Sequence, residues 1–151
     1  MSGQNLTRRG FLRGGSMAVL SGLAGCSALG GSKSQADVFH TSAENVDAEV
    51  VVYWFWGDGC PHCADQMPFM GELAKRENVA VVALEVYNSD ENRQRQQEFA
   101  DAYGIEKVAV PMTFVGNEYW VGWADEVKQE IKSKVEACLE SDCPAPTAKL
   151  E

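Results

Sequence analysis

The chain is poor in basic residues, with 13 Lys and Arg against 22 Asp and Glu among its 151 residues and a formal net charge of -9. A surface this acidic argues against nucleic acid or an anionic membrane surface as a partner, because both carry negative charge. The first 25 residues contain three Arg and no acidic residue, so the remaining 126 residues carry a net charge of -12. We attribute this acidity to solubility rather than to a function, and adaptation to high salt would give the same bias.

The N-terminus lacks an apolar stretch long enough to cross a bilayer. Residues 17–24 form a short apolar region that Gly22 interrupts, whereas a spanning helix needs about 20 apolar residues. This region follows Arg8-Arg9-Gly10-Phe11-Leu12, which resembles a twin-arginine export signal, an address that directs folded protein across the membrane. We therefore predict a signal peptide over residues 1–25 and an extracytoplasmic location.

The segment Leu23-Ala24-Gly25-Cys26 resembles a lipobox, in which Cys26 becomes the lipidated first residue after cleavage. The alternative is an ordinary small-residue cleavage site with an incidental Cys. Residues 26–46 are rich in Gly and Ser, which is typical of a flexible tether, and His40 is interpreted as an ordinary linker residue. The lipid would anchor the protein to the outer face of the cell membrane without a spanning helix. A folded domain is predicted over residues 47–143, with a tail over residues 144–151.

The chain has five Cys and only one Cys-x-x-Cys sequence, Cys60-Pro61-His62-Cys63. A zinc site would need a second pair of ligands, and the remaining pair, Cys138 and Cys143, has four residues between its members. A plain structural disulfide is the other alternative. The sequence around the tetrad favours a dithiol redox site over both.

Cys60 is expected at the start of a helix. The apolar run Val50-Val51-Val52-Tyr53-Trp54-Phe55-Trp56 predicts a buried strand, Gly57-Asp58-Gly59 predicts a turn, and residues 64–77 have helical spacing. Free backbone N–H groups and the helix dipole favour an anion at this position, so Cys60 is expected to be a nucleophilic thiolate. Cys63 lies one turn further on, where it can resolve a mixed disulfide.

The remaining elements complete an α/β pattern. A second buried strand is predicted over residues 79–87, a polar helix over residues 91–103 ending at Gly104, two hairpin strands over residues 112–115 and 119–121, and a last helix over residues 124–139. The order β-α-β-α-β-β-α predicts a central mixed sheet flanked by helices.

This order, with Cys60-Pro61-His62-Cys63 after the first strand and Val110-Pro111 before the third, resembles the thioredoxin fold over residues 47–143. The resemblance implies that the bond before Pro111 is cis and that Pro111 packs beside the dithiol. It also implies that the backbone of Val110 pairs with a substrate peptide as an added strand. Trp56 is expected to flank the dithiol. A strand-start proline is the alternative for Pro111.

The Pro-His pair between the cysteines resembles the DsbA group of disulfide oxidases, in which a His stabilises the thiolate and makes the disulfide more oxidising. His62 is expected to have that effect here, or else to be a solvated surface residue. The chain lacks the large helical insertion of DsbA proteins. Trp54 stands where many thioredoxins have a buried Asp, so Glu85 is the candidate for a buried carboxylate that accepts the proton of Cys63. The alternative is a solvent-facing Glu85 at a strand edge.

Cys138 and Cys143 are predicted to form a structural disulfide at the end of the last helix, as an oxidising compartment favours. Five positions apart on an unbroken helix they could not be bridged, so Ser141-Asp142 is expected to end the helix. A redox relay to Cys60 and Cys63 and a metal site are the alternatives.

These patterns predict an exported, lipid-anchored thiol:disulfide oxidoreductase that acts on protein thiols, has a possible membrane redox partner, and needs no organic cofactor or metal. Cys60 is the expected attacking group and Cys63 the resolving group. Three alternatives remain open. They are a reductase for exported clients such as apocytochromes, a copper-delivery protein using Cys60, His62 and Cys63, and a redox-inert interaction domain.

Overall fold

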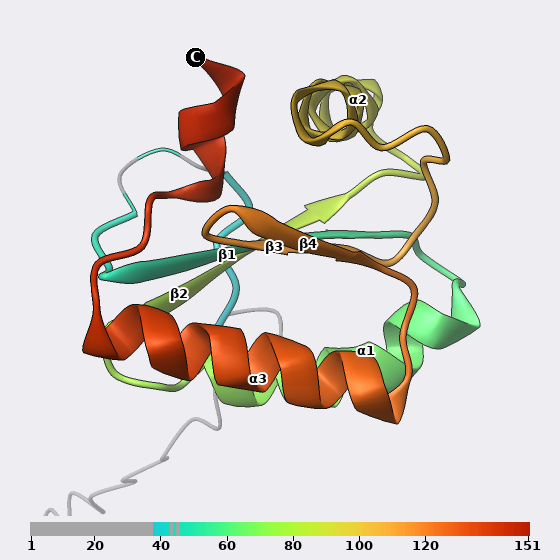
Figure 1. Ribbon diagram of the computed structural model, residues 1–151. Helices are drawn as coiled ribbons and strands as arrows, with labels where there is room; N and C mark the ends of the chain where they lie inside the picture. Colours follow the sequence, from blue (N-terminus) through green and yellow to red (C-terminus); the bar gives the residue numbers. More distant parts are fainter. Residues whose placement is uncertain (1–37, 43, 45) are drawn as a thin grey trace, which may run out of the picture. The chain divides into compact units, whose positions relative to one another are not determined.

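The computed structural model describes residues 38–151 except residues 43 and 45 (Figure 1). The predicted signal peptide over residues 1–25, the lipidation site Cys26 and most of the predicted tether lie outside the described residues. Among the helices of the described part, none is both long and apolar enough to cross a membrane.

A four-stranded mixed sheet forms the centre of the fold. Its strands are β1 (Val50–Trp56), β2 (Val79–Glu85), β3 (Met112–Val115) and β4 (Glu118–Val121), arranged in the order β2-β1-β3-β4. Strand β1 runs parallel to β2 and antiparallel to β3, and β3 and β4 form an antiparallel hairpin.

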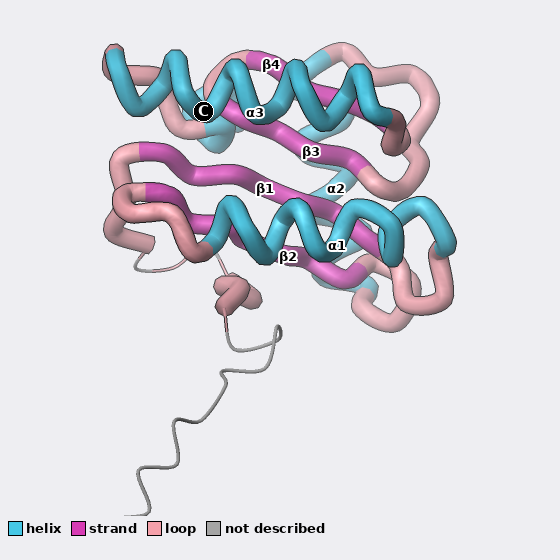
Figure 2. Tube along the Cα trace, turned by 90° about the horizontal axis from the view of Figure 1, so that it is seen from below, coloured by secondary structure: helices cyan, strands magenta, loops and turns pink. Residues whose placement is uncertain are grey.

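Helices cover both faces of this sheet. Helix α2 (Asp90–Tyr103) lies on one face, and α1 (Pro61–Ala74) and α3 (Asp125–Glu140) lie on the other, where Figure 2 shows them side by side across the strands. The predicted element order and fold class are confirmed. The strand order and the placement of the helices are those of the thioredoxin fold.

Strand β1 is buried on both faces because its side chains alternate between two core clusters. Trp54 packs among the residues of α1 and α3, while Phe55 packs with Phe99 of α2, and both side chains are fully buried. This explains why the strand reads as a continuous apolar run rather than as an alternating one. The chain leaves β1 at the edge of both clusters, at the turn that leads into α1.

Helix α1 begins three residues earlier than the spacing predicted, at Pro61, and ends at Ala74 rather than at residue 77. Cys60 has extended backbone angles and acts as the N-cap, and Pro61 occupies a first-turn position where a missing N–H costs nothing. Pro68 lies inside the helix without ending it. The dithiol therefore belongs to the first turn of the helix itself.

Both ends of the folded part extend beyond the predicted boundaries. In the segment predicted as tether, the N–H of His40 donates to the carbonyl of Val81 (2.9 Å) and the carbonyl of His40 accepts from the N–H of Ala83 (2.8 Å). The segment predicted as a tail forms a 3₁₀ helix, Pro146–Leu150, that packs against α2. The interpretation of His40 as an ordinary linker residue was wrong, because its backbone pairs with the outer edge of β2.

Tyr103, at the end of α2, holds the C-terminal segment on the fold. Its hydroxyl lies 2.8 Å from the carbonyl oxygen of Gly116 and 3.1 Å from that of Pro146. Burial raises the pKa of Tyr103 to about 12. The hydroxyl can donate to these carbonyls only while it is protonated.

We expect Tyr103→Phe to lower the free energy of unfolding by about 1 kcal/mol near pH 8, because a hydrogen bond is lost. Since the folded-state pKa is raised, the contribution is fully present below about pH 10, the value for an unfolded tyrosine, and is lost as the pH rises toward 12. Urea unfolding of both proteins between pH 8 and pH 12 tests this. A difference that stays constant over that range would contradict the role of Tyr103.

Candidate active site

The two cysteines of the tetrad are joined by a disulfide, with their Cα atoms 5.2 Å apart. The sulfur of Cys60 accepts a hydrogen bond from the N–H of Cys63 at 3.2 Å, which is the N-cap contact of α1. Cys60 is 9% exposed and Cys63 only 1%. An approaching sulfur can therefore reach Cys60 more readily than Cys63, and after reduction the first turn of α1 would offer its N–H groups to a Cys60 thiolate.

A pocket of about 210 Å³ opens beside this disulfide. Its lining consists of the turn after β1, the first residues of α1 and two larger side chains, Trp56 and Met67. The indole of Trp56 is half-buried and stacks on that of Trp54, with the ring centroids 5.7 Å apart. Trp56 therefore lines the same pocket as the dithiol, and its contact with a substrate remains a prediction.

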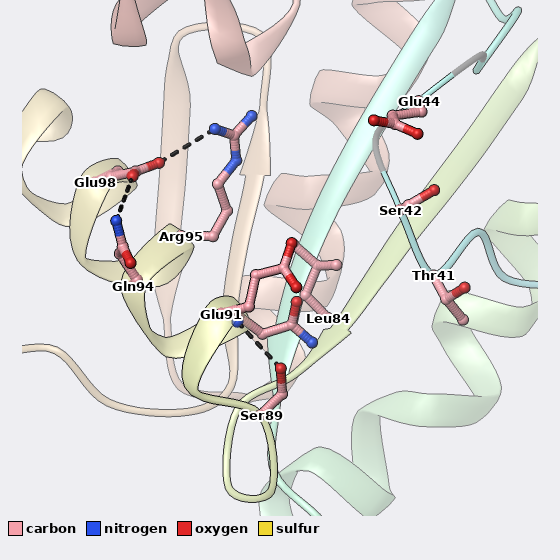
Figure 3. A pocket seen from close by; sticks show the side chains of 10 residues that line it. Thr41, Ser42, Glu44, Leu84, Ser89, Glu91, Gln94, Arg95 and Glu98 are labelled. Carbon is pink, nitrogen blue, oxygen red and sulfur yellow. Dashed lines mark hydrogen bonds and ion pairs between the residues drawn. The ribbon is translucent and has the colours of Figure 1, made fainter.

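A larger hollow of about 700 Å³ shares no residue with the dithiol pocket (Figure 3). It lies between residues 41, 42 and 44 and the first turns of α2 and is lined mainly by polar side chains. Arg95 pairs with Glu98 at 3.1 Å, and the hydroxyl of Ser89 caps the helix by accepting from Asn92. Because these side chains are engaged within their own helix, we place the candidate active site at the smaller pocket.

The bond between Val110 and Pro111 is cis, as the resemblance implies. Pro111 is buried and lies just before β3, whose first residue, Met112, pairs with Phe55 near the end of β1. The register therefore puts Pro111 at the same end of the sheet as the dithiol turn. No hydrogen bond among the described residues uses the N–H or C=O of Val110.

A chain of neutral hydrogen bonds runs through the core beneath the dithiol. The indole N–H of Trp54 donates to Gln66 Oε1 at 3.0 Å, and Gln66 Nε2 donates to Thr113 Oγ1 at 2.9 Å. Gln66 is fully buried, three residues after Cys63 on the inner side of α1. Sequence reasoning identified Trp54 at the position of the usual Asp but missed Gln66, whose polar side chain interrupts the apolar face of α1.

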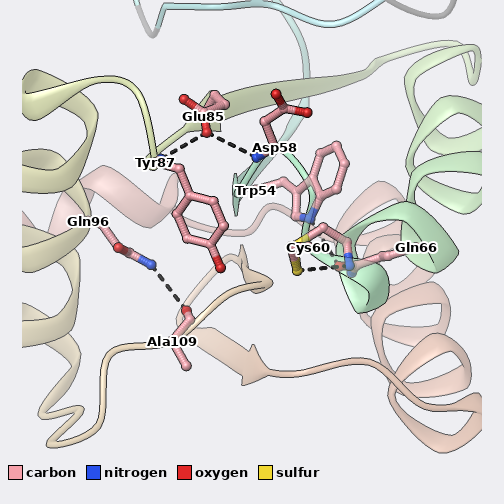
Figure 4. The surroundings of a disulfide bond; sticks show 9 residues. Trp54, Asp58, Cys60, Gln66, Glu85, Tyr87, Gln96 and Ala109 are labelled. Carbon is pink, nitrogen blue, oxygen red and sulfur yellow. Dashed lines mark hydrogen bonds between the residues drawn. A yellow bond between two sulfur atoms is a disulfide. The ribbon is translucent and has the colours of Figure 1, made fainter.

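Glu85 is not the buried carboxylate that the sequence suggested. Its side chain is partly exposed at the end of edge strand β2, and its oxygens accept N–H groups from Asp58 (3.0 Å), Tyr87 (2.8 Å) and Asn88 (2.8 Å). Partial burial alone would raise the pKa of Glu85, but these backbone donors outweigh it and lower the pKa. A carboxylate stabilised in this way is a poor proton acceptor. Its observed role is to join the turn before Cys60 to the loop after β2 (Figure 4).

His62 is exposed in the first turn of α1, directly between Pro61 and Cys63. No hydrogen bond among the described residues involves its side chain. The influence of His62 on the dithiol remains a prediction.

Cys138 and Cys143 form the predicted second disulfide, with Cα atoms 5.1 Å apart. A β-carbon placed on Gly116 would lie 3.6 Å from the sulfur of Cys138, so this disulfide packs against the β3–β4 turn. That turn follows Val115, which pairs with Val52, whereas the dithiol follows Trp56. Val52 and Trp56 are four residues apart on β1, which corresponds to roughly 13 Å at 3.3 Å per residue. Direct exchange between the two disulfides of one molecule, the relay alternative, does not fit this geometry.

Among the described residues, no group of three or more His, Cys, Asp or Glu side chains is arranged to hold a metal ion. The buried polar side chains of this part are Gln66, Gln96 and Thr113, and none of them carries a charge.

No protein-family model matches the chain, and no curated protein matches it either. Among solved structures, a protein from Agrobacterium tumefaciens is similar at 21% identity and a TM-score of 0.48, over 61% of this chain and 47% of that one. A point mutant of thioredoxin from Halobacterium salinarum is 32% identical with a TM-score of 0.43, over 58% of this chain and 76% of that one. A glutaredoxin from Archaeoglobus fulgidus is 18% identical with a TM-score of 0.38, over 58% of this chain and 86% of that one.

The chain therefore spans about half the length of the Agrobacterium protein and most of the two redox proteins. The thioredoxin fold follows from the strand order β2-β1-β3-β4, from the helices on both faces, and from the dithiol at the start of α1.

Replacing Glu85 by Gln should destabilise the fold at neutral pH, because the three backbone N–H groups lose a charged acceptor. The pKa of Glu85 is lower in the folded than in the unfolded protein, so its contribution is present above the unfolded value near 4.5 and is lost as the pH falls through the folded value. The difference in free energy of unfolding between wild type and Glu85→Gln should therefore vanish in acid. Equal stability of the two proteins at pH 7 would argue against the contacts described.

Proposed function

We propose that this protein is a thiol:disulfide oxidoreductase that exchanges disulfides with protein thiols through Cys60 and Cys63. The observation that carries the proposal is the position of this pair at the N-terminus of α1, where Cys60 is 9% exposed beside an open pocket and Cys63 is 1% exposed. A structural disulfide needs neither an accessible sulfur nor a helix terminus that stabilises a thiolate.

In the oxidising direction, a client thiolate attacks the sulfur of Cys60, and the Cys60–Cys63 bond breaks with Cys63 leaving as a thiolate that takes up a proton. A second client thiolate then attacks the client sulfur of the mixed disulfide. The client disulfide forms, and Cys60 leaves as a thiolate. Two electrons pass from the client to the dithiol. The reducing direction is the same sequence reversed.

The loop before β3 supports a peptide as the substrate. The backbone N–H and C=O of Val110 are unpaired among the described residues, next to the buried Pro111, at the sheet end that carries the dithiol. An extended client segment can pair with Val110 as an added strand, which holds its cysteine in place. Trp56, in the pocket wall, supplies an apolar contact beside the reacting sulfurs.

Export and lipid anchoring belong to the proposal on the strength of the sequence alone, through Arg8-Arg9 and Leu23-Ala24-Gly25-Cys26. The disulfide between Cys138 and Cys143, which is separate from the proposed catalytic pair, supports an oxidising compartment. Anchoring at Cys26 would place the dithiol near clients and redox partners at the outer face of the membrane.

The reduction potential of the Cys60–Cys63 pair tests the proposal and its direction. It would be measured by equilibration with glutathione, in a form of the protein that begins after Cys26 and has Cys138 and Cys143 changed to Ser. A value near roughly -120 mV identifies a disulfide donor, and a value near roughly -270 mV identifies a reductase. In parallel, Cys63→Ala should trap clients as mixed disulfides in extracts, and Cys60→Ala, the matched control, should trap none. The proposal would be contradicted if the Cys60–Cys63 pair did not exchange with glutathione and Cys63→Ala trapped no client.

His62 is proposed to favour the Cys60 thiolate and so to make the disulfide more oxidising. Replacing His62 by Ala should lower the reduction potential by about 30 mV, which for two electrons corresponds to about 1.4 kcal/mol. His40, the only other histidine, provides the matched control. His40→Ala should leave the potential unchanged, because the contacts of His40 with β2 use only its backbone. A potential that His62→Ala does not shift would show that His62 is a solvated bystander.

A further inference from the structure

Tyr87, in the loop after β2, combines a fixed backbone with an exposed aromatic ring. Its N–H donates to Glu85 Oε1 at 2.8 Å, and its carbonyl accepts from Arg93 Nη1 at 2.9 Å. The side chain is nevertheless 53% exposed, the largest fraction among the large apolar side chains of the described part. Because the backbone is already fixed and a tyrosine side chain has only two rotatable angles, little conformational freedom is lost when a partner binds to the ring.

The ring of Tyr87 lies directly against the turn that carries the dithiol. A β-carbon placed on Gly57 would lie 2.5 Å from ring atoms of Tyr87, closer than any real contact allows. Gly57 lines the dithiol pocket, and its carbonyl accepts the N–H of Cys60 at 3.1 Å. One residue therefore touches the ring of Tyr87 and is hydrogen-bonded to the reactive cysteine.

Glu85 and Val86 fix the distance between the two loops. Glu85 Oε1 accepts the N–H of Asp58 as well as that of Tyr87, and the N–H of Val86 donates to the carbonyl of Trp56 at 2.8 Å. Figure 4 shows the carboxylate of Glu85 between Asp58 and Tyr87, with the Tyr87 ring pointing from there toward Ala109. Glu85 is thus a positioning residue for the ring.

The segment that contains Ala109 lies on the side toward which the Tyr87 ring points (Figure 4). Gln96 Nε2 donates to the carbonyl of Ala109 at 3.1 Å, which holds the residues before Pro111 against α2. Val108, next to Ala109, is 39% exposed. Because the Tyr87 ring points toward Ala109, next to Val110 (Figure 4), a peptide that pairs with Val110 would have this ring within reach.

We propose that Tyr87 determines specificity, by binding an apolar side chain that flanks the reacting cysteine in an extended client peptide. This inference rests on the proposed disulfide exchange. It assigns to Tyr87 recognition of the client and no part in the chemistry at the sulfurs. Glutathione, which is too small to place an apolar flank on the ring, should be indifferent to Tyr87.

The test uses the oxidised protein and two peptides that each contain one Cys and differ only in its flanking residues, Leu in one and Ser in the other. Rate constants for mixed-disulfide formation are measured for both peptides and for reduced glutathione. Wild type should favour the Leu peptide. Tyr87→Ala should lower the rate constant for the Leu peptide about tenfold. The rate constants for the Ser peptide and for glutathione should stay within about twofold of the wild-type values.

Two control variants separate recognition from general damage. Tyr87→Phe keeps the ring and should retain the preference for the Leu peptide. Tyr119, on β4 at the opposite edge of the sheet, is 41% exposed, and Tyr119→Ala should leave all three rates near those of wild type.

A substitution at Gly57 tests the contact itself. Gly57→Ala should displace the ring, because the added methyl group would occupy its place, and should reduce the Leu preference as Tyr87→Ala does. In the double variant Gly57→Ala/Tyr87→Ala no ring remains to be displaced, so the preference should be no lower than in Tyr87→Ala alone.

The outcomes separate the role of Tyr87 from the exchange activity itself. A wild type that reacts with glutathione and with both peptides, together with an unchanged Leu preference in Tyr87→Ala, would overturn the role of Tyr87 and leave the exchange activity standing. An equal loss for all three thiols would also overturn it, because the effect would then be on the dithiol. A wild type that reacts with none of the thiols would overturn the proposed function and the inference together.

Discussion

The site depends on a single local constraint, the start of helix α1 at Cys60. Strand β1 is buried on both faces, so the chain must turn sharply where the two core clusters end, and Pro61 sets the first helical turn there. The N–H of Cys63 then points at the sulfur of Cys60. The difference in exposure between the two cysteines follows from the same geometry, since Cys63 lies on the inner side of the first turn and Cys60 at its open end.

Glu85 shows how one side chain at a sheet edge can organise several loops. Its carboxylate satisfies three backbone N–H groups that would otherwise face the end of the sheet without a partner. Two of these groups belong to the loop after β2, and the third belongs to the turn before Cys60. The same contacts hold the Tyr87 ring against Gly57. Thus an edge carboxylate, rather than a buried one, connects β2 with the dithiol turn.

Much of the fold could be predicted from the sequence because its signals are local. The apolar run of β1, the end of α2 at Gly104, and the last helix, α3, are where the pattern placed them to within a residue. The contacts that the sequence did not reveal join residues far apart along the chain. Gln66 is bonded to a residue 12 positions earlier and to one 47 positions later, and Tyr103 to one 43 positions later. Spacing along one element cannot show such contacts. The pairing of His40 with β2 and the packing of the C-terminal 3₁₀ helix against α2 were missed for the same reason. A short segment with polar residues around it gives no local sign that it packs against the rest of the fold.

The neutral hydrogen-bond chain from Trp54 through Gln66 to Thr113 affects how the redox equilibrium of the dithiol depends on pH. Disulfide exchange moves protons as well as electrons, and a carboxylate under a dithiol would make the redox equilibrium respond to its own ionisation. An indole, an amide and a hydroxyl do not ionise at any pH near neutrality. The packing beneath Cys63 therefore keeps one electrostatic state across that range. The pH dependence of electron transfer is left to the two sulfurs themselves and to groups in contact with water.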